Sequence, residues 1–215
     1  MTPPNRQLEK KFLQSIVKPL NDLQHRLIEP FVYSSTYSSI ETDTGGIASA
    51  IAHFPEQIPS RHIAKETRIK LCDASFEYDL IVNYNDTVKH RALTKESRIT
   101  NMSVYSRFEY CETRGFRFMR TVPYLMPNGN LPNKYDFVQV AIESIQMLAN
   151  KFEFSADFVQ AFPDSSEGFF EWATLYHTKA SREVSVEAFN IEFVRKVNDD
   201  EYTLVDPPTV KFVVI

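Results

Sequence analysis

The chain has few glycines, and none of them lies in a phosphate-binding pattern. Among its 215 residues there are only five, at Gly45, Gly46, Gly115, Gly129 and Gly168. Loops that hold the pyrophosphate of a nucleotide need closely spaced glycines, because the backbone must approach the phosphates. The sequence therefore argues against a classical nucleotide-binding site, and we expect no cofactor.

Cysteines and long apolar runs are scarce as well. Cys72 and Cys111 stand 39 residues apart, and neither belongs to a C-x-x-C pair. This pattern predicts free thiols and a reducing compartment rather than a disulfide framework. No apolar run approaches the ~18 residues that a membrane span requires, and the first residues lack the apolar segment of a signal peptide. We therefore expect a cytoplasmic protein without a membrane partner.

Motifs that would indicate catalysis are missing too. The five histidines show no H-E-x-x-H pattern and no zinc spacing with the cysteines, and no G-x-S-x-G is present. Asp43-Thr44-Gly45 matches the short signature of aspartic proteases, but no apolar run precedes it and no second copy exists. We interpret this triplet as a polar turn. The sequence predicts no enzyme and no catalytic or metal site.

The first quarter of the chain predicts a helix and then an extended segment. Over residues 5–29, apolar residues recur every three or four positions, which is typical of one helical stripe: Leu8, Phe12, Ile16, Leu20, Leu23 and Leu27. Pro19 should kink or split this helix. The stripe either packs on the chain's own core or docks on another subunit. Residues 31–46, rich in Ser and Thr, predict an extended arm, followed by a short helix over 47–54 with Thr44 as its N-cap.

The rest of the chain predicts a sheet and one further helix. An alternation of apolar and polar residues indicates strands over 76–84, 103–124, 169–178, 184–197 and 202–215. A shift in this alternation predicts a bulge near Phe189–Asn190, and residues 198–200 predict a turn. A wide apolar face over 134–152 indicates a helix capped by Asn133, residues 87–98 suggest a short helix, and the prolines over 123–132 suggest a loop. The expected class is α+β: a mostly antiparallel sheet with one long packed helix, after an N-terminal helix and arm. We expect a boundary near residue 60, separating 1–60 from a sheet domain over 61–215, unless the chain forms one domain.

The 103–124 segment is the most informative part of the sequence. It reads as two strands joined by a tight turn, in which four arginines (Arg107, Arg114, Arg117 and Arg120) alternate with aromatic residues. Residues 61–124 carry a net charge of +4, whereas the remainder carries −8. We predict that Phe108, Phe116 and Phe118 face the core and that the arginines form ion pairs with an acidic neighbour. The four arginines are the candidate contact residues.

One part of this hairpin supports a different interpretation. Arg114, Gly115, Phe116 and Phe118 match the longer core motif of the RNA-recognition-motif family, which this segment resembles. The predicted order of elements from residue 76 onwards, β-α-β-β-α-β, is similar to that family as well. Arg117 and Thr121 depart from the pattern. The resemblance implies that aromatic residues on the central strands stack on nucleic-acid bases.

Together these observations favour a non-enzymatic structural or assembly protein. The N-terminal helix, the arm and the apolar carboxyl-terminal run suggest segments that contact other protein subunits, either copies of this chain or different chains. A virus-particle component, such as a phage tail protein, would suit this profile. The alternatives are a nucleic-acid-binding protein that uses the hairpin, and an enzyme whose site the residue spacing does not reveal.

Overall fold

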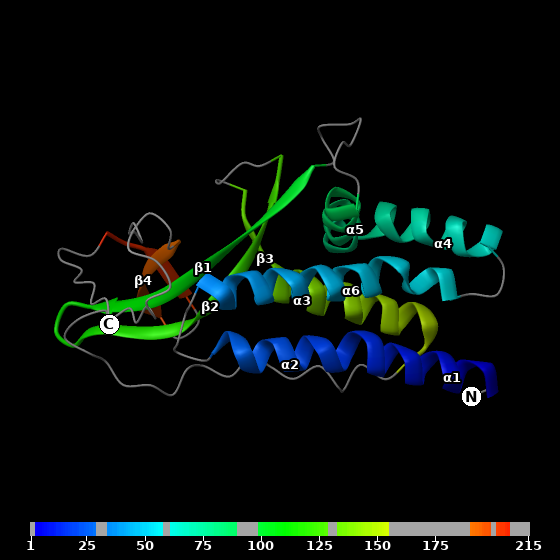
Figure 1. Cartoon of the computed structure of the whole chain (residues 1–215), viewed down its shortest axis with the longest axis horizontal. Helices are drawn as coiled ribbons and strands as arrows, with labels where there is room; N and C mark the ends of the chain where they lie inside the picture. The colour runs from blue at the N-terminus through cyan, green and yellow to red at the C-terminus, as the bar shows by residue number, and fades with distance from the viewer. Residues whose placement is uncertain are drawn as a thin grey trace. The chain divides into compact units, whose positions relative to one another are not determined.

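The computed structural model of the chain describes residues 3–28, 34–57, 61–89, 99–128, 133–154, 190–198 and 201–206. Among the described residues, helices form most of the chain before residue 90, and the strands with helix α6 follow from Thr100 onwards (Figure 1). In chain order the elements are α1 (Pro3–Phe12), the π-helical turn η1 (Leu13–Val17), α2 (Lys18–Leu27), α3 (Ser34–His53), the 3₁₀ turn η2 (Phe54–Gln57), α4 (Arg61–Ala74), α5 (Phe76–Lys89), β1 (Thr100–Cys111), β2 (Gly115–Pro127), β3 (Tyr135–Asp136), α6 (Phe137–Phe152), β4 (Ile191–Asn198) and β5 (Glu201–Leu204). The α+β class is confirmed, but more of the chain is helical than the sequence predicted.

The chain divides into two compact units, each built from segments far apart in sequence. The first comprises Met1–Gln24, Glu41–Ser103 and Pro123–Ala161, and the second comprises His25–Ile40, Val104–Val122 and Phe162–Ile215. Both units therefore contain residues from either side of position 60. Among the described helices, none has the length and apolar character needed to cross a membrane.

The N-terminal helix is present, and its apolar stripe is core. Five stripe residues are almost completely inaccessible to solvent: Phe12, Ile16, Leu20, Leu23 and Leu27. The widened turn η1 ends at Val17, two residues before Pro19, and the N–H of the following Lys18 bonds to the Leu13 carbonyl five residues back. Proline lacks an N–H, and it is tolerated at the start of a helix. The interruption predicted at Pro19 is thus a local widening, and the stripe is buried in the chain's own core.

The prediction of an extended arm over 31–46 is wrong, because α3 begins at Ser34. Ile40, Thr44, Ile47 and Ile51 are all buried, at helical spacing. Thr44 lies inside the helix rather than at its N-cap, and Asp43-Thr44-Gly45 is not a turn. The Ser/Thr-rich composition concealed this stripe, since a threonine occupies one of its core positions.

The prediction of a strand over 76–84 is also wrong, because these residues belong to α5. The Ser75 hydroxyl oxygen accepts a hydrogen bond from the Tyr78 N–H at 3.1 Å, which caps the helix, and Glu77 and Asp79 lie in its first turn. Every residue from Leu80 to Asn85 is buried. A helix buried on most sides carries apolar residues all round, so the helical period is lost from its sequence. Residues 90–98 of the suggested short helix lie outside the described part.

The long hairpin and the helix after it are confirmed. β1 and β2 meet at a turn over residues 112–114, and Gly115 follows with a φ of 84°, a conformation that glycine adopts without strain. β2 extends through Pro127, so the loop predicted from residue 123 begins later. α6 is capped by Asp136, whose Oδ1 accepts from the Val138 N–H at 3.0 Å, and not by Asn133. The apolar face predicted over 134–152 is buried, including Phe137, Ile145 and Leu148, and α6 packs mainly on helix α5.

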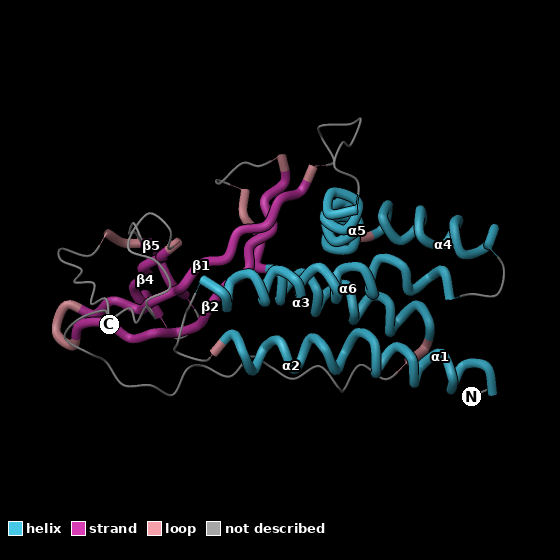
Figure 2. Tube along the Cα trace, in the orientation of Figure 1, coloured by secondary structure: helices cyan, strands magenta, loops and turns pink. Residues whose placement is uncertain are grey.

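The five strands, drawn in magenta in Figure 2, follow the order β3-β2-β1-β4-β5. β1 and β4 are parallel, with Phe108 opposite Phe193, whereas β4 and β5 are antiparallel with an irregularity between Lys196 and Asn198. The sheet is therefore mixed but mostly antiparallel. Several predicted features lie outside the described residues: the strand over 169–178, residues 184–189 with the first residue of the predicted bulge, Asp199 and Asp200 of the predicted turn, and residues 207–215.

Candidate functional site

The four predicted contact arginines all lie on the β1–β2 hairpin. Arg107 is on β1, Arg114 is in the turn, and Arg117 and Arg120 are on β2. The Arg107 Nε donates to Glu192 Oε2 at 2.7 Å, and the Arg117 Nε donates to Glu109 Oε2 at 3.0 Å. Two of the arginines therefore pair with glutamates of their own chain, and a contact of the four arginines with another chain stays a prediction.

In both ion pairs, the glutamate side chain is less exposed to solvent than the arginine side chain. The side chains of Glu109 and Glu192 are 4% and 3% exposed, whereas those of Arg107 and Arg117 are each 23% exposed. Each arginine thus covers a carboxylate that lies almost out of water. Glu109 could have been found from the alternation of β1, which places it on the face of Arg107. Glu192 could not, because its place opposite Arg107 depends on the parallel pairing of β1 with β4.

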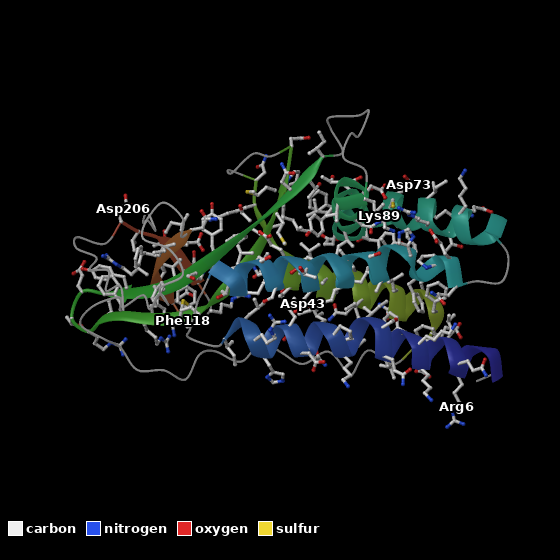
Figure 3. All side chains as sticks on the ribbon, in the orientation of Figure 1. Arg6, Asp43, Asp73, Lys89, Phe118 and Asp206 are labelled. Atoms are coloured by element: carbon white, nitrogen blue, oxygen red, sulfur yellow. The ribbon has the colours of Figure 1, made fainter. Side chains whose placement is uncertain are left out.

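The opposite face of this part of the sheet is aromatic, as predicted. Phe108, Phe116 and Phe118 are buried together, with Phe193 beside them (Figure 3 labels Phe118). The Phe108 and Phe118 rings meet edge to face with centroids 5.4 Å apart, and Phe116 and Phe193 do so at 5.6 Å. These rings are core side chains. The resemblance to RNA-recognition motifs is not supported, because its aromatic residues are buried and the segment 76–84 is helical.

The tip of the hairpin carries an unusual thiol. Cys111 Sγ lies 3.4 Å from Thr113 Oγ1, and hydrogen bonds from Thr113 and then Arg114 lower the pKa of the Cys111 thiol to about 7. Both cysteines of the chain are free. The Cys111 thiol is therefore substantially ionised near neutral pH, which favours nucleophilic reaction. On β1, desolvation and the nearby Glu192 raise the pKa of the partly buried Tyr105, which lies on the same face as Arg107.

The other notable part of the sheet is its β4–β5 end. Val197 on β4 is 58% exposed and Leu204 on β5 is 62% exposed, the latter being the largest exposure among the exposed large apolar side chains. Among the described residues, no strand pairs with the outer side of β5. The Val205 N–H donates to the Phe193 carbonyl at 3.0 Å. Because backbone groups alternate in direction along an antiparallel strand, the N–H groups of Tyr202 and Leu204 point away from β4.

Comparisons of this chain with models of protein families, with curated proteins and with solved structures find no match. Among the described residues, no group of three or more His, Cys, Asp and Glu side chains is arranged to hold a metal ion.

Proposed function

We propose that the chain is a non-enzymatic assembly subunit that associates with further copies of itself through strand β5. The observation that supports this proposal is an edge strand whose outward N–H groups accompany an exposed Leu204. An edge strand with exposed apolar residues is a template for pairing with another chain, and proteins normally shield such edges. Virus particles are one setting in which such a subunit works.

A symmetric pair of β5 strands is compatible with the residues at this edge. Most soluble oligomers are symmetric, and a two-fold axis makes the two partner surfaces identical. Opposed residues of an antiparallel pair have side chains on the same face of the sheet, so the two-fold axis passes through a residue. In a pair centred on Thr203, Thr203 lies opposite Thr203, and Tyr202 of one copy lies opposite Leu204 of the other. Within Glu201–Leu204 no like charges face each other, the tyrosine ring meets an apolar side chain, and the two threonines lie opposite each other, which favours cross-strand pairing.

The test is the mass of the purified chain by light scattering over a range of concentrations. We expect the wild type to form oligomers and Leu204→Lys to be monomeric, because a lysine on an edge strand opposes pairing. Val88→Lys is the matched control. Val88 on α5 is 58% exposed, close to the 62% of Leu204, and its replacement should leave the mass unchanged. A monomeric wild type, or equal effects of the two lysines, would contradict the proposal.

The runner-up function, nucleic-acid binding by the hairpin, is less well supported by the geometry. A base-stacking surface needs exposed aromatic rings with basic groups beside them. Here Phe108, Phe116 and Phe118 are buried, and Arg107 and Arg117 are neutralised by glutamates. Titration of labelled single-stranded RNA and DNA discriminates the two functions: binding that weakens steeply with salt would favour the runner-up.

A further inference from the structure

The helix that opens the chain presents a basic face to solvent in the first unit. The exposed side chains that lie between its basic residues, Gln7, Gln14 and Ser15, are uncharged. Figure 3 shows Arg6, at the beginning of this helix, pointing away from the ribbon. The basic face consists of four exposed side chains on α1 and at the start of α2: Arg6, Lys10, Lys11 and Lys18.

The described part of the chain does not neutralise this face. No ion pair among the described residues involves any of its four members, whereas Arg68 and Arg117 both pair with carboxylates. Of the acidic residues on the same helix, Glu9 is partly buried and Asp22 follows the last lysine. Four basic side chains therefore face solvent along one stretch of helix.

The widened turn η1 keeps the members of the basic face on one side of the helix. Arg6, Lys10 and Lys18 are separated by multiples of four residues, and each step of four drifts by about 40° around an α-helix of 3.6 residues per turn. From Arg6 to Lys18 this drift would reach about 120°. The π-helical turn η1 lies between Lys10 and Lys18 and takes in one extra residue, which removes about 100° of the drift. The cations are thus aligned over about 18 Å of helix, at 1.5 Å per residue.

The composition of the basic face indicates the chemistry of its partner. Among the described residues, the exposed large apolar side chains lie on α4, α5, β4 and β5, and none lies on α1 or α2. Protein interfaces bury aromatic or apolar anchors and contain few lysines, and membrane-bound amphipathic helices insert apolar side chains. Interfaces with nucleic acid are polar and strongly positive, and most of their hydrogen bonds go to phosphate and sugar. The basic face also lacks the exposed aromatic rings on which single strands stack.

We propose that the basic face binds the phosphate backbone of double-stranded nucleic acid without reading its sequence. A duplex carries one negative charge per about 1.7 Å of its axis, so a phosphate is within reach of each of the four cations. The net charge of −4 on the whole chain does not prevent this contact, because charges more than about 10 Å away are screened at 0.1 M salt. The proposal does not depend on the pairing of β5.

The experiment is a titration of the full chain with a labelled DNA duplex of about 20 base pairs, followed by fluorescence anisotropy between about 50 and 200 mM salt. We expect micromolar binding at the lowest salt and a slope of log affinity against log salt of about −3 to −4, because each phosphate contact contributes about −0.9. The affinity should therefore fall about a hundredfold over this range. A duplex RNA of equal length forms the second arm, and the duplex that binds more tightly is the ligand.

The variants separate the basic face from general charge effects. Lys10→Gln/Lys18→Gln should weaken duplex binding at about 50 mM salt by tenfold or more, and should make the salt slope shallower by about 2, since each lysine removed is one phosphate contact. The matched control is Lys65→Gln/Lys151→Gln, which removes two exposed lysines from α4 and α6 and should leave the slope unchanged. Thermal unfolding should give the same midpoint for both double variants and the wild type, because all four lysines are exposed.

Several results would overturn the proposal. They include undetectable duplex binding at about 50 mM salt and equal losses of affinity in the two double variants. A single strand that binds more tightly than the duplex would indicate base stacking, which the basic face cannot provide. Binding to vesicles of phosphatidylserine without binding to either duplex would assign the face to an anionic membrane surface instead.

Discussion

At Glu109 and Glu192, two carboxylates lie almost out of water and depend on one arginine each. A buried charge is costly unless it is paired and hydrogen-bonded, and removing one partner is worse than removing both. Arg117 and Arg107 therefore have a structural role in the sheet, whatever else the hairpin contacts. Any loss of function in variants of these arginines must be separated from a loss of stability.

Arg117→Ala should lower the free energy of unfolding by about 2 kcal/mol, because it leaves Glu109 buried without its partner. We reduce the value below that of a fully buried pair because the Arg117 side chain is 23% exposed. Denaturant unfolding measures the change. The control is Arg195→Ala, which breaks the exposed pair with Glu112 and should cost less than about 1 kcal/mol.

Two further measurements test whether Arg117 stabilises the sheet by pairing with the buried Glu109. Replacing both partners with methionine should restore most of the stability lost in Arg117→Ala, since no buried charge then remains. If Arg117→Ala were as stable as the wild type, Glu109 would have to reach water, and the pair would be no different from an exposed one.

At the scale of the elements, helix α3 contains residues that helices disfavour. Gly45 and Gly46 lie in its interior, where glycine costs about 1 kcal/mol relative to alanine. A β-carbon at Gly46 would meet nothing within 4 Å, and one at Gly45 would meet only the Tyr84 hydroxyl oxygen at 3.9 Å. Close packing does not require glycine at either position, so the helix would be more stable with alanine there.

Gly46→Ala should therefore raise the free energy of unfolding by about 0.5–1 kcal/mol, because alanine loses less backbone freedom on folding. Thermal or denaturant unfolding detects the change. Gly115→Ala is the opposing control: with a φ of 84° at the hairpin, an alanine there is strained and should destabilise the chain. A destabilised Gly46→Ala would mean that this segment is not helical in solution.

At the scale of the whole molecule, the N-terminal helix belongs to the fold and is not an attached arm. Its stripe from Phe12 to Leu27 is buried, and Phe12 also joins an aromatic cluster with Phe54 and Phe154, at centroid distances of 5.1 and 5.3 Å. Segments from the beginning, the middle and the later part of the first unit thus share one core. Deleting the N-terminal helix would expose that core rather than release a separate sheet domain.

Leu20→Ala tests this role, since Leu20 is completely buried. The substitution should cost about 2–5 kcal/mol of unfolding free energy, the range for a buried large-to-small change, and should leave the oligomeric mass unchanged. Denaturant unfolding and light scattering on the same samples provide the two readings. A variant that kept its stability but lost association would show that the stripe docks on another subunit.

From the sequence alone, the N-terminal stripe, the 103–124 hairpin and α6 could be predicted, because each has one buried and one exposed face. A single buried face leaves its period in the sequence: three or four residues for Leu20 and Leu23, and two for Phe116 and Phe118. The aromatic side of the hairpin was recognisable for the same reason. So was the α+β class.

Only the tertiary structure decided the rest. α5 is buried from Leu80 to Asn85, and burial on all sides erases the period that distinguishes a helix from a strand. The partners of the charged residues were equally hidden, since Arg107 and Glu192 are 85 residues apart. Local sequence encodes which faces are apolar, whereas chain topology decides which strand lies at the edge of the sheet and which distant charges meet.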